Sequence, residues 1–227
     1  MRVFSCPLPR YACLMIISPS RKFAFVHIPK TGGTAFTLAY EAKARADDLL
    51  FGDTPKAKRR QAKFNRTAPR RLRKHAALSD AQAALPTLAW SEFTVATIVR
   101  NPWDRLVSLY AWSRAQTFDH PMIAAARTQD FAAYLADPRV EAPLRHNTPE
   151  TYLAGAAHRH ILRYETLADD VATLARTLDI RLPPLERVNA SDRPADYRAA
   201  YDTATIARVA DLCSYEVAVL GYRFSDE

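Results

Sequence analysis

The chain of 227 residues is poor in cysteine, in glycine and in long apolar runs. Its three cysteines are an odd number without metal-ligand spacing, which argues against a disulfide framework and suits a reducing compartment. Apolar runs such as residues 13–17 are far shorter than the roughly 20 residues that span a bilayer. Pro7, Pro9 and Arg10 interrupt the segment where a signal peptide would be apolar. These absences predict a cytoplasmic protein without a membrane anchor.

The rest of the composition is that of an ordinary globular protein, with 48% hydrophobic and 25% charged residues. A chain of this length is expected to form a single compact domain. The segment that begins at Met15 has the character of a natural start. We therefore assign residues 1–14 to an N-terminal extension and residues 15–227 to one domain.

The net charge of +8 comes from one short segment. Residues 56–74 contain ten lysines and arginines and no acid, and without them the rest of the chain has a formal charge of −2. Three interpretations are open: a surface for an acidic acceptor such as a uronic-acid glycan, phosphate contacts to nucleic acid, or a solvated basic insertion. The last is the commonest role of a charge run, and only Phe64 could stack on bases. We expect residues 52–76 to form a basic, partly mobile insertion.

Two strand–loop–helix units follow from the apolar patterning. Residues 22–28 are aromatic and β-branched and predict a buried strand, which leads through two adjacent glycines into a predicted helix at 34–45. Residues 92–99 predict a second strand, which leads through Arg100 into a helix that ends near residue 114. In that second loop Asn101 suits a helix N-cap and Pro102 suits the first helical turn.

Further elements complete an α/β pattern. A third strand is predicted at 160–164, and apolar residues at helical spacing predict helices after it and near the C-terminus (Leu167, Val171, Leu174 and Leu178; Ile206, Val209, Leu212, Val217 and Leu220). Alternating strands and helices indicate an α/β fold: a single domain with a mainly parallel central sheet flanked by helices and a P-loop-like nucleotide-binding core. Ligands of such sheets bind beyond the carboxyl ends of the strands, where both loops are expected.

The first loop has the parts of an anion-binding site. Gly32 and Gly33 expose backbone N–H groups, the helix N-terminus adds partial positive charge, and Lys30 adds a full one. Thr31 and Thr34 add hydroxyl donors, and Thr34 is also expected to cap the helix. In a Walker A loop the lysine follows the glycines, whereas here it precedes them. This order argues against an ordinary nucleotide triphosphatase.

Two motifs resemble those of a known family. FVHIPKTGGT resembles the 5′-phosphosulfate loop of sulfotransferases that use 3′-phosphoadenosine 5′-phosphosulfate (PAPS), and TIVRNPWDRLVSLY resembles their 3′-phosphate motif. RYETL, VNASDRPADYRAAYD and GYRF are similar to the carbohydrate-type branch, sulfotransferase family 2. The resemblance runs from about Met15 to Phe224, with the basic segment poorly matched, and Ala35 stands where the family often has serine.

The resemblance implies roles for individual residues. Lys30 would be catalytic and would bind the cofactor together with Thr31, Gly32, Gly33 and Thr34, while Arg100 and Ser108 would hold the 3′-phosphate. The alternatives are a pairing of Arg100 with a carboxylate inside the fold and an unremarkable helical serine at 108. Cations and backbone amides would replace any metal.

Five further residues lie in the family-like stretches of the sequence. Asp104 and Arg105 are expected to be structural. Asn189, Ser191 and Arg193 match a family stretch near the cofactor, without assigned contacts.

The acceptor hydroxyl also needs a base, for which histidine is the natural candidate near neutral pH. His75 lies between the two motifs beside Lys74, in a context similar to that of the catalytic histidine of many sulfotransferases. Glu41 is a weaker substitute. His27 is expected to be packed on the first strand. His158 and His160 could bind a metal, but no Cys or acid cluster lies near them in the sequence, so no metal site is expected.

The sequence thus predicts a PAPS-dependent sulfotransferase that acts on a hydroxyl group of a carbohydrate, with an acidic glycan as a candidate acceptor. Two alternatives are a P-loop-like kinase and a polyanion- or nucleic-acid-binding module with a silent cofactor cleft. Steep salt dependence of DNA or heparin binding would favour the module, and ATP turnover with magnesium would favour the kinase.

Overall fold

The computed structural model describes residues 13–186, 188 and 193–225 of the chain. Five strands form one sheet in the order β3-β1-β2-β4-β5 (β1 Cys13–Ser18, β2 Phe23–Val26, β3 Leu49–Gly52, β4 Thr94–Val99, β5 His158–Arg163). β1 runs antiparallel to both β2 and β3, whereas β2–β4 and β4–β5 are parallel pairs. Four strands therefore share one direction and β1 alone is reversed. The predicted single-domain α/β fold is confirmed.

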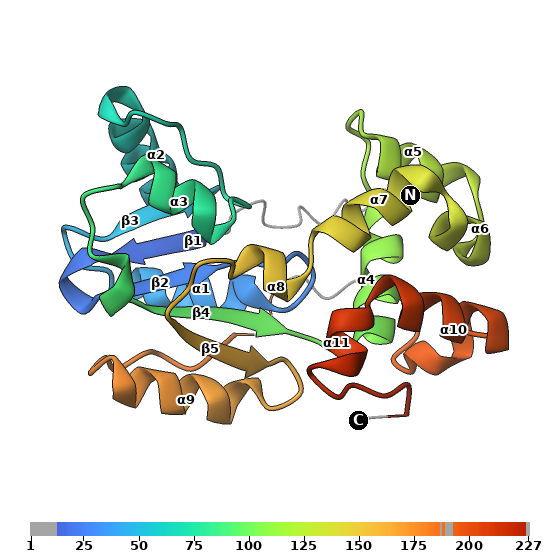
Figure 1. Ribbon diagram of the computed structural model, residues 1–227. Coiled ribbons are helices and arrows are strands. Elements are labelled where there is room, and N and C mark those ends of the chain that lie inside the picture. Colours follow the sequence, from blue (N-terminus) through green and yellow to red (C-terminus); the bar gives the residue numbers. More distant parts are fainter. Residues whose placement is uncertain (1–12, 187, 189–192, 226–227) are drawn as a thin grey trace, which may run out of the picture.

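Helices cover both faces of the sheet and extend beyond one end of it (Figure 1). They are α1 Gly33–Ala42, α2 Pro55–Thr67, α3 Leu78–Ala84, α4 Pro102–Arg114, α5 Pro121–Thr128, α6 Phe131–Ala136, α7 Pro138–His146, α8 Pro149–Tyr152, α9 Leu167–Thr177, α10 Thr203–Leu212 and α11 Ser214–Ala218. Three short 3₁₀ helices lie at Pro19–Arg21, Trp90–Glu92 and Tyr197–Ala200. In the described part of the chain, no helix combines the length and the apolar character that crossing a membrane requires.

The core has two halves because successive strand residues face opposite sides of the sheet. Phe23 and Phe25 of β2 pack with α1 and α9 on one face. Ala24 and Val26 pack on the other face, in a larger cluster that includes residues of α3, α4 and the C-terminal helices. Both faces of β2 and β4 are buried, which explains why these strands read as nearly continuous apolar segments.

The elements predicted by local patterning are found, with shifted ends. The predicted strands appear as β2, β4 and β5, and the predicted helices as α1, α4, α9, α10 and α11. Asn101 is the N-cap of α4, where its side chain accepts from the N–H groups of Trp103 and Asp104, and Pro102 opens the helix. The sequence analysis did not predict β1 or β3. It also did not predict the helices between residues 121 and 152.

Residues 56–67 of the basic segment lie in helix α2, which packs against the outer strand β3. Thr54 caps α2, and the Gly52 N–H donates to the Gln61 side chain at 3.2 Å. The Phe64 ring packs edge-on against Phe51 of β3, with 5.4 Å between ring centroids. The partial mobility expected for residues 52–76 stays a prediction.

The boundary drawn after residue 14 falls inside a strand. Cys13 and Leu14, which the sequence interpretation placed in the extension, belong to β1. The rest of the proposed extension lies outside the described residues.

Candidate functional site

The loops that follow β2 and β4 lie side by side at the carboxyl ends of these two strands. β2 and β4 are parallel neighbours, so residues 27–32 after β2 and Arg100 and Asn101 after β4 emerge at the same edge (Figure 1). Each loop leads directly into a helix, α1 or α4. The N-termini of two helices therefore meet at this edge, as the sequence predicts.

The glycine loop is closely packed from both sides. Gly32 has φ of 87°, and a Cβ added there would approach the Tyr164 ring to 2.6 Å. A Cβ on Gly33 would lie 2.0 Å from Cδ2 of His27, a side chain only 5% exposed. Lys30 also has a left-handed backbone, with φ of 69°. Glycine at 32 and 33 is thus required by the backbone and by the neighbouring rings respectively.

The first turn of α1 keeps N–H groups available. Gly32 is its N-cap, and no side chain among the described residues caps this helix. Thr34 is the second helical residue, so the expectation that it caps α1 is wrong; the glycines move the start of the helix forward. The Thr31 hydroxyl donates to the Ile28 carbonyl at 2.8 Å. By contrast, the Asn101 side chain already occupies the first N–H groups of α4. An anion would therefore find open amides at α1 rather than at α4.

Lys30 is held in a positively charged environment. Burial lowers the pKa of Lys30 to about 8, and the nearby guanidinium groups of Arg100 and Arg193 add to this shift. The Lys30 Nζ also lies 5.7 Å from the ring centroid of Trp112. Negative charge delivered to this position would relieve the repulsion among three cations.

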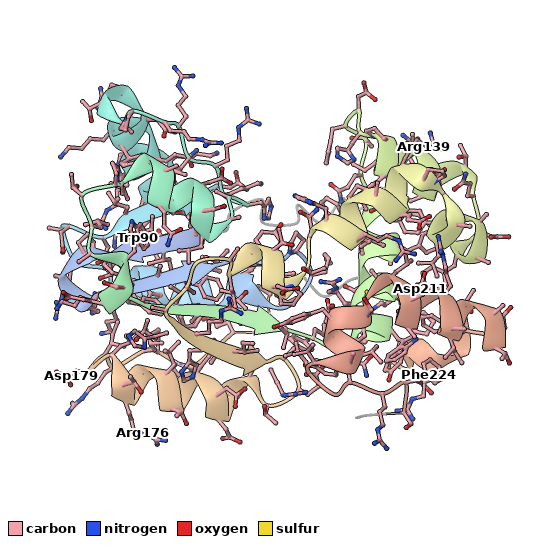
Figure 2. The ribbon with its side chains drawn as sticks, viewed as in Figure 1. Trp90, Arg139, Arg176, Asp179, Asp211 and Phe224 are labelled. Atoms are coloured by element: carbon pink, nitrogen blue, oxygen red, sulfur yellow. The ribbon has the colours of Figure 1, made fainter. Side chains whose placement is uncertain are left out.

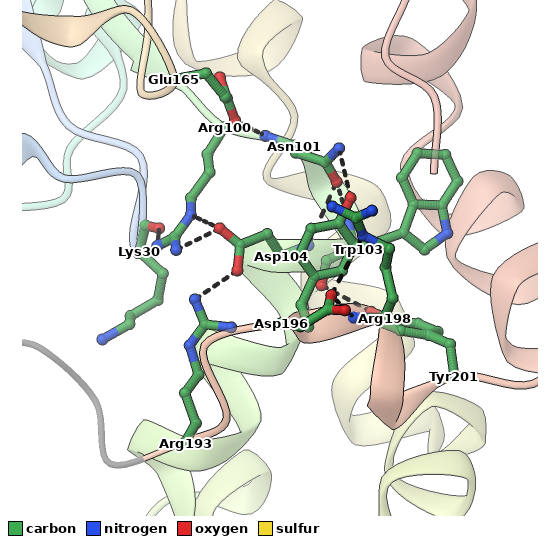
Figure 3. A network of polar contacts seen from close by, with 11 residues as sticks. Lys30, Arg100, Asn101, Trp103, Asp104, Glu165, Arg193, Asp196, Arg198 and Tyr201 are labelled. Carbon is green, nitrogen blue, oxygen red and sulfur yellow. Dashed lines mark hydrogen bonds and ion pairs between the residues drawn. The ribbon is translucent and has the colours of Figure 1, made fainter. Parts of the chain in front are cut away.

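Arg100, Asp104 and Arg193 form an ion-pair cluster beside Lys30, which Figure 3 shows. Arg100 donates to Oδ2 of Asp104 from Nε at 2.7 Å and from Nη2 at 2.5 Å, and Arg193 donates to Oδ1 at 2.5 Å. Arg100 Nη1 donates to the Lys30 carbonyl at 3.2 Å. The alternative in which Arg100 pairs with a carboxylate of the fold is thus what the structure shows. Two guanidinium groups share one carboxylate, so the cluster keeps an excess positive charge.

Arg193, which had no assigned contact in the sequence analysis, belongs to this cluster. Its side chain is 13% exposed, and its Nη1 is buried without a hydrogen-bond partner among the described residues. A buried donor without a partner calls for an explanation, and a bound anion would supply one. Asp104, expected to be structural, links Arg193 to Arg100; the spacing of four residues between Arg100 and Asp104 could have revealed that half of the cluster.

The segment RYETL, residues 163–167, packs against both loops of the site. The Tyr164 ring lies between Gly32 and Arg100, whose guanidinium carbon is 4.2 Å from the ring centroid. Glu165 accepts from the Asn101 N–H at 2.6 Å and from the Tyr222 hydroxyl at 2.9 Å. These contacts attach the second loop to β5 and to the C-terminal segment.

The C-terminal segment also packs against the start of α4. The Asn101 amide donates to the Arg223 carbonyl at 3.0 Å. Phe224, labelled in Figure 2, packs edge-on against Trp103, with ring centroids 5.8 Å apart. The family-like stretches of the sequence therefore converge on one place in the fold.

His75 lies next to His27, with 5.5 Å between the ring centroids. The His75 side chain is solvent-exposed, yet desolvation of its ring by the surrounding protein lowers its pKa to about 4. The Lys74 ammonium lowers it further, while Asp53 and the His27 backbone carbonyl oppose the shift. Burial lowers the pKa of His27, and the adjacent His75 ring and the Lys30 and Lys74 ammonium groups lower it further, so His27 too is held neutral. As predicted, His27 is packed in the fold.

The remaining candidates differ in their distance from this site. Ser108 is buried in α4, 3% exposed, on the helix that carries Asp104. Glu41 lies near the far end of α1, about 12 Å along the helix from Gly33, and accepts from the Thr54 hydroxyl at 2.7 Å. The structure does not bring Glu41 to the glycine loop.

Three further predictions concern other regions. Arg105 is buried with Glu216 at 3.3 Å and with the Cys213 thiol, which agrees with a structural role. Asn189 and Ser191 lie outside the described residues. Within the described ranges, no group of three or more His, Cys, Asp or Glu side chains is arranged to hold a metal ion, and this includes the surroundings of His158 and His160.

Comparison with known proteins supports one family. No curated protein matches the chain in a sequence search. A family model described as "Sulfotransferase family" matches residues 14–222, which include both loops, RYETL and the stretch that leads to Tyr222. With its glycine loop, its arginine cluster and this match over nearly the whole chain, the protein belongs to the sulfotransferase family.

Proposed function

We propose that this protein transfers a sulfuryl group from PAPS to a hydroxyl group of a carbohydrate acceptor. The observation that carries the proposal is the meeting of Lys30, the open N-terminus of α1 and the Arg100–Arg193 pair at the ends of β2 and β4. Such a site offers positive charge in two places, as a donor with a 5′-phosphosulfate and a separate 3′-phosphate requires.

The residues present fit this donor. The Gly33 and Thr34 N–H groups and the Lys30 ammonium would hold the phosphosulfate. Arg100 and Ser108 would hold the 3′-phosphate, with Asp104 giving up part of its contact to Arg100. When bound, the donor supplies the sulfuryl group and leaves as adenosine 3′,5′-bisphosphate. Lys30 is placed to neutralise charge that develops on the departing phosphate.

His75 is our candidate for the general base. Its lowered pKa keeps the imidazole neutral near pH 7, and its exposed surface leaves it accessible to an acceptor. A neutral imidazole would take the hydroxyl proton as the new S–O bond forms. His27 would keep this ring in place beneath the glycine loop.

The test is a calorimetric titration with adenosine 3′,5′-bisphosphate, with AMP and ADP as controls. We expect the 3′-phosphate to improve affinity at least tenfold, and Arg100→Ala to abolish most of that gain. Arg176→Ala, on the exposed surface of α9, serves as the matched control and should bind like the wild type (Figure 2). Equal or absent binding of all three nucleotides would overturn the proposal.

The role of His75 needs its own experiment. We expect His75→Gln to lose at least a hundredfold in turnover while its bisphosphate affinity stays within twofold of wild type. Turnover at the wild-type rate in this variant would remove His75 as the base.

One observation favours a second function. α2 carries most of the basic segment on a helix beside β3, where it could bind a polyanion without the cofactor site. Heparin binding with a steep salt dependence, unchanged in Lys30→Gly and without any bisphosphate binding, would favour a polyanion-binding module.

A further inference from the structure

Exposed aromatic side chains gather at one place on this protein. Among the described residues, three large hydrophobic side chains are exposed: Trp112 (37%), Phe118 (52%) and Val219 (64%). Trp112 and Phe118 are neighbours, with ring centroids 6.3 Å apart. The His120 ring continues the row, 6.4 Å from Phe118. We call Trp112, Phe118 and His120 the aromatic shelf.

The shelf adjoins the candidate site. Trp112 lies in the last turn of α4, and the other two residues lie in the connection from α4 to α5. The Lys30 ammonium is 5.7 Å from the Trp112 ring centroid, so one end of the shelf touches the group placed at the sulfuryl donor. An acceptor that presents a hydroxyl to that donor would bring its non-reacting part onto the shelf.

The surroundings of the shelf are polar and open. A recess of about 260 Å³ beside it is lined by Phe118 and Ile123 together with Thr117, Asp119, His120 and Arg127. An apolar ring face with hydrogen-bonding groups around its rim matches a pyranose, which has a C–H face and hydroxyl groups at its edge. A phenolic acceptor would instead favour an enclosed apolar slot.

We propose that Trp112 and Phe118 form the surface on which a sugar ring of the acceptor stacks, with the recess at His120 and Arg127 holding the adjoining sugar. This inference rests on the proposed function and names the place and the chemistry of acceptor recognition. Contiguous exposed apolar surface of this kind commonly marks a binding site. The shelf thereby becomes a determinant of acceptor specificity, separate from the cofactor loops.

The experiment measures sugar binding with the protein saturated by adenosine 3′,5′-bisphosphate. Hexasaccharides of heparosan, chondroitin and N-acetyllactosamine are titrated by calorimetry, and 4-nitrophenol is titrated in parallel. We expect at least one hexasaccharide to bind, and Trp112→Ala and Phe118→Ala each to weaken it about three- to tenfold. Trp112→Phe should restore most of the affinity, and Val219→Ala, at the exposed C-cap residue of α11, should have no effect.

Two readouts separate this inference from the proposed function. Phe118→Ala should keep the bisphosphate affinity of the wild type, because the cation–π contact of Lys30 is made with Trp112. The sugar titrations are repeated without nucleotide, so that sugar binding is measured even if the bisphosphate does not bind. Failure of bisphosphate binding then counts against the proposed function alone. Binding of no hexasaccharide, binding unchanged by both alanine variants, or binding of 4-nitrophenol alone would each overturn the shelf as a sugar site.

Discussion

Lys30 combines a strained backbone with a destabilised charge. Its left-handed φ costs a residue with a Cβ roughly 1–2 kcal/mol. Arg100 compensates in part by donating to the Lys30 carbonyl, yet the same guanidinium, with Arg193, lowers the pKa of the Lys30 ammonium. Anion binding would relieve the electrostatic cost and leave the backbone cost unchanged.

The pKa of Lys30 near 8 predicts a pH-dependent affinity for the bisphosphate. The ammonium is charged below this pKa and neutral above it, so binding that needs the charge should weaken about tenfold from pH 7 to pH 9. Lys30→Gly fits the left-handed backbone and removes the amine. Its affinity should be lower at pH 7 and nearly flat over this range, as calorimetry would show. An equally steep dependence in that variant would assign the titration to another group.

At the scale of elements, the site depends on how closely α1 approaches β2. The Gly33 position has no room for a methyl group because the His27 ring fills it. Crowding of this kind commonly costs 1–3 kcal/mol and displaces the backbone nearby. The displaced groups here would be the open amides of α1.

Gly33→Ala should therefore weaken bisphosphate binding at least tenfold and lower the free energy of unfolding by about 1–3 kcal/mol. His27→Ala makes room for the new methyl group, so the double variant should recover part of the affinity lost in Gly33→Ala. Titration and thermal unfolding of the single and double variants form the test. If the fold loss of affinity in the double variant equals the product of the fold losses in the two single variants, crowding by His27 is not the cause.

The elements that the sequence predicted are those with a strong local signal. β2 and β4 are apolar segments followed by clear helix starts, and both were found. β3 is four residues long, and α5 to α8 are short helices of four to nine residues, so their periodicity is weak. In the site, the loops were predicted from local motifs. The pairing of Arg193 with Asp104 joins residues 89 apart, which local patterning cannot reveal.

At the scale of the whole molecule, the site is held by segments distant in the sequence. Asn101 bonds to Arg223, 122 residues later, and Glu165 joins Asn101 to Tyr222. The glycine loop, the start of α4, the end of β5 and the C-terminal segment therefore share one network. Loosening one contact should affect the stability of the entire domain.

Glu165→Ala tests this dependence because it leaves the Asn101 N–H without its acceptor. We expect a loss of about 1–3 kcal/mol in the free energy of unfolding, which lowers Tm by roughly 3–10 °C in a chain of this size. Glu186→Ala, at another exposed glutamate, is the control and should shift Tm by less than about 1 °C. Differential scanning calorimetry measures both. An unchanged Tm in Glu165→Ala would mean that water replaces the carboxylate at no cost.

Asp104 has a consequence for the selection and release of ligands. It would act as an intramolecular competitor, because an anion that takes the guanidinium groups bridged by Asp104 has to exchange with this carboxylate. A singly charged buffer ion gains little from such an exchange, whereas a ligand with several negative charges gains the contacts of both guanidinium groups and of Lys30. When that ligand departs, Asp104 would pair with both arginines again. In the proposed reaction, this single carboxylate would disfavour small anions and would compete with the product for both arginines.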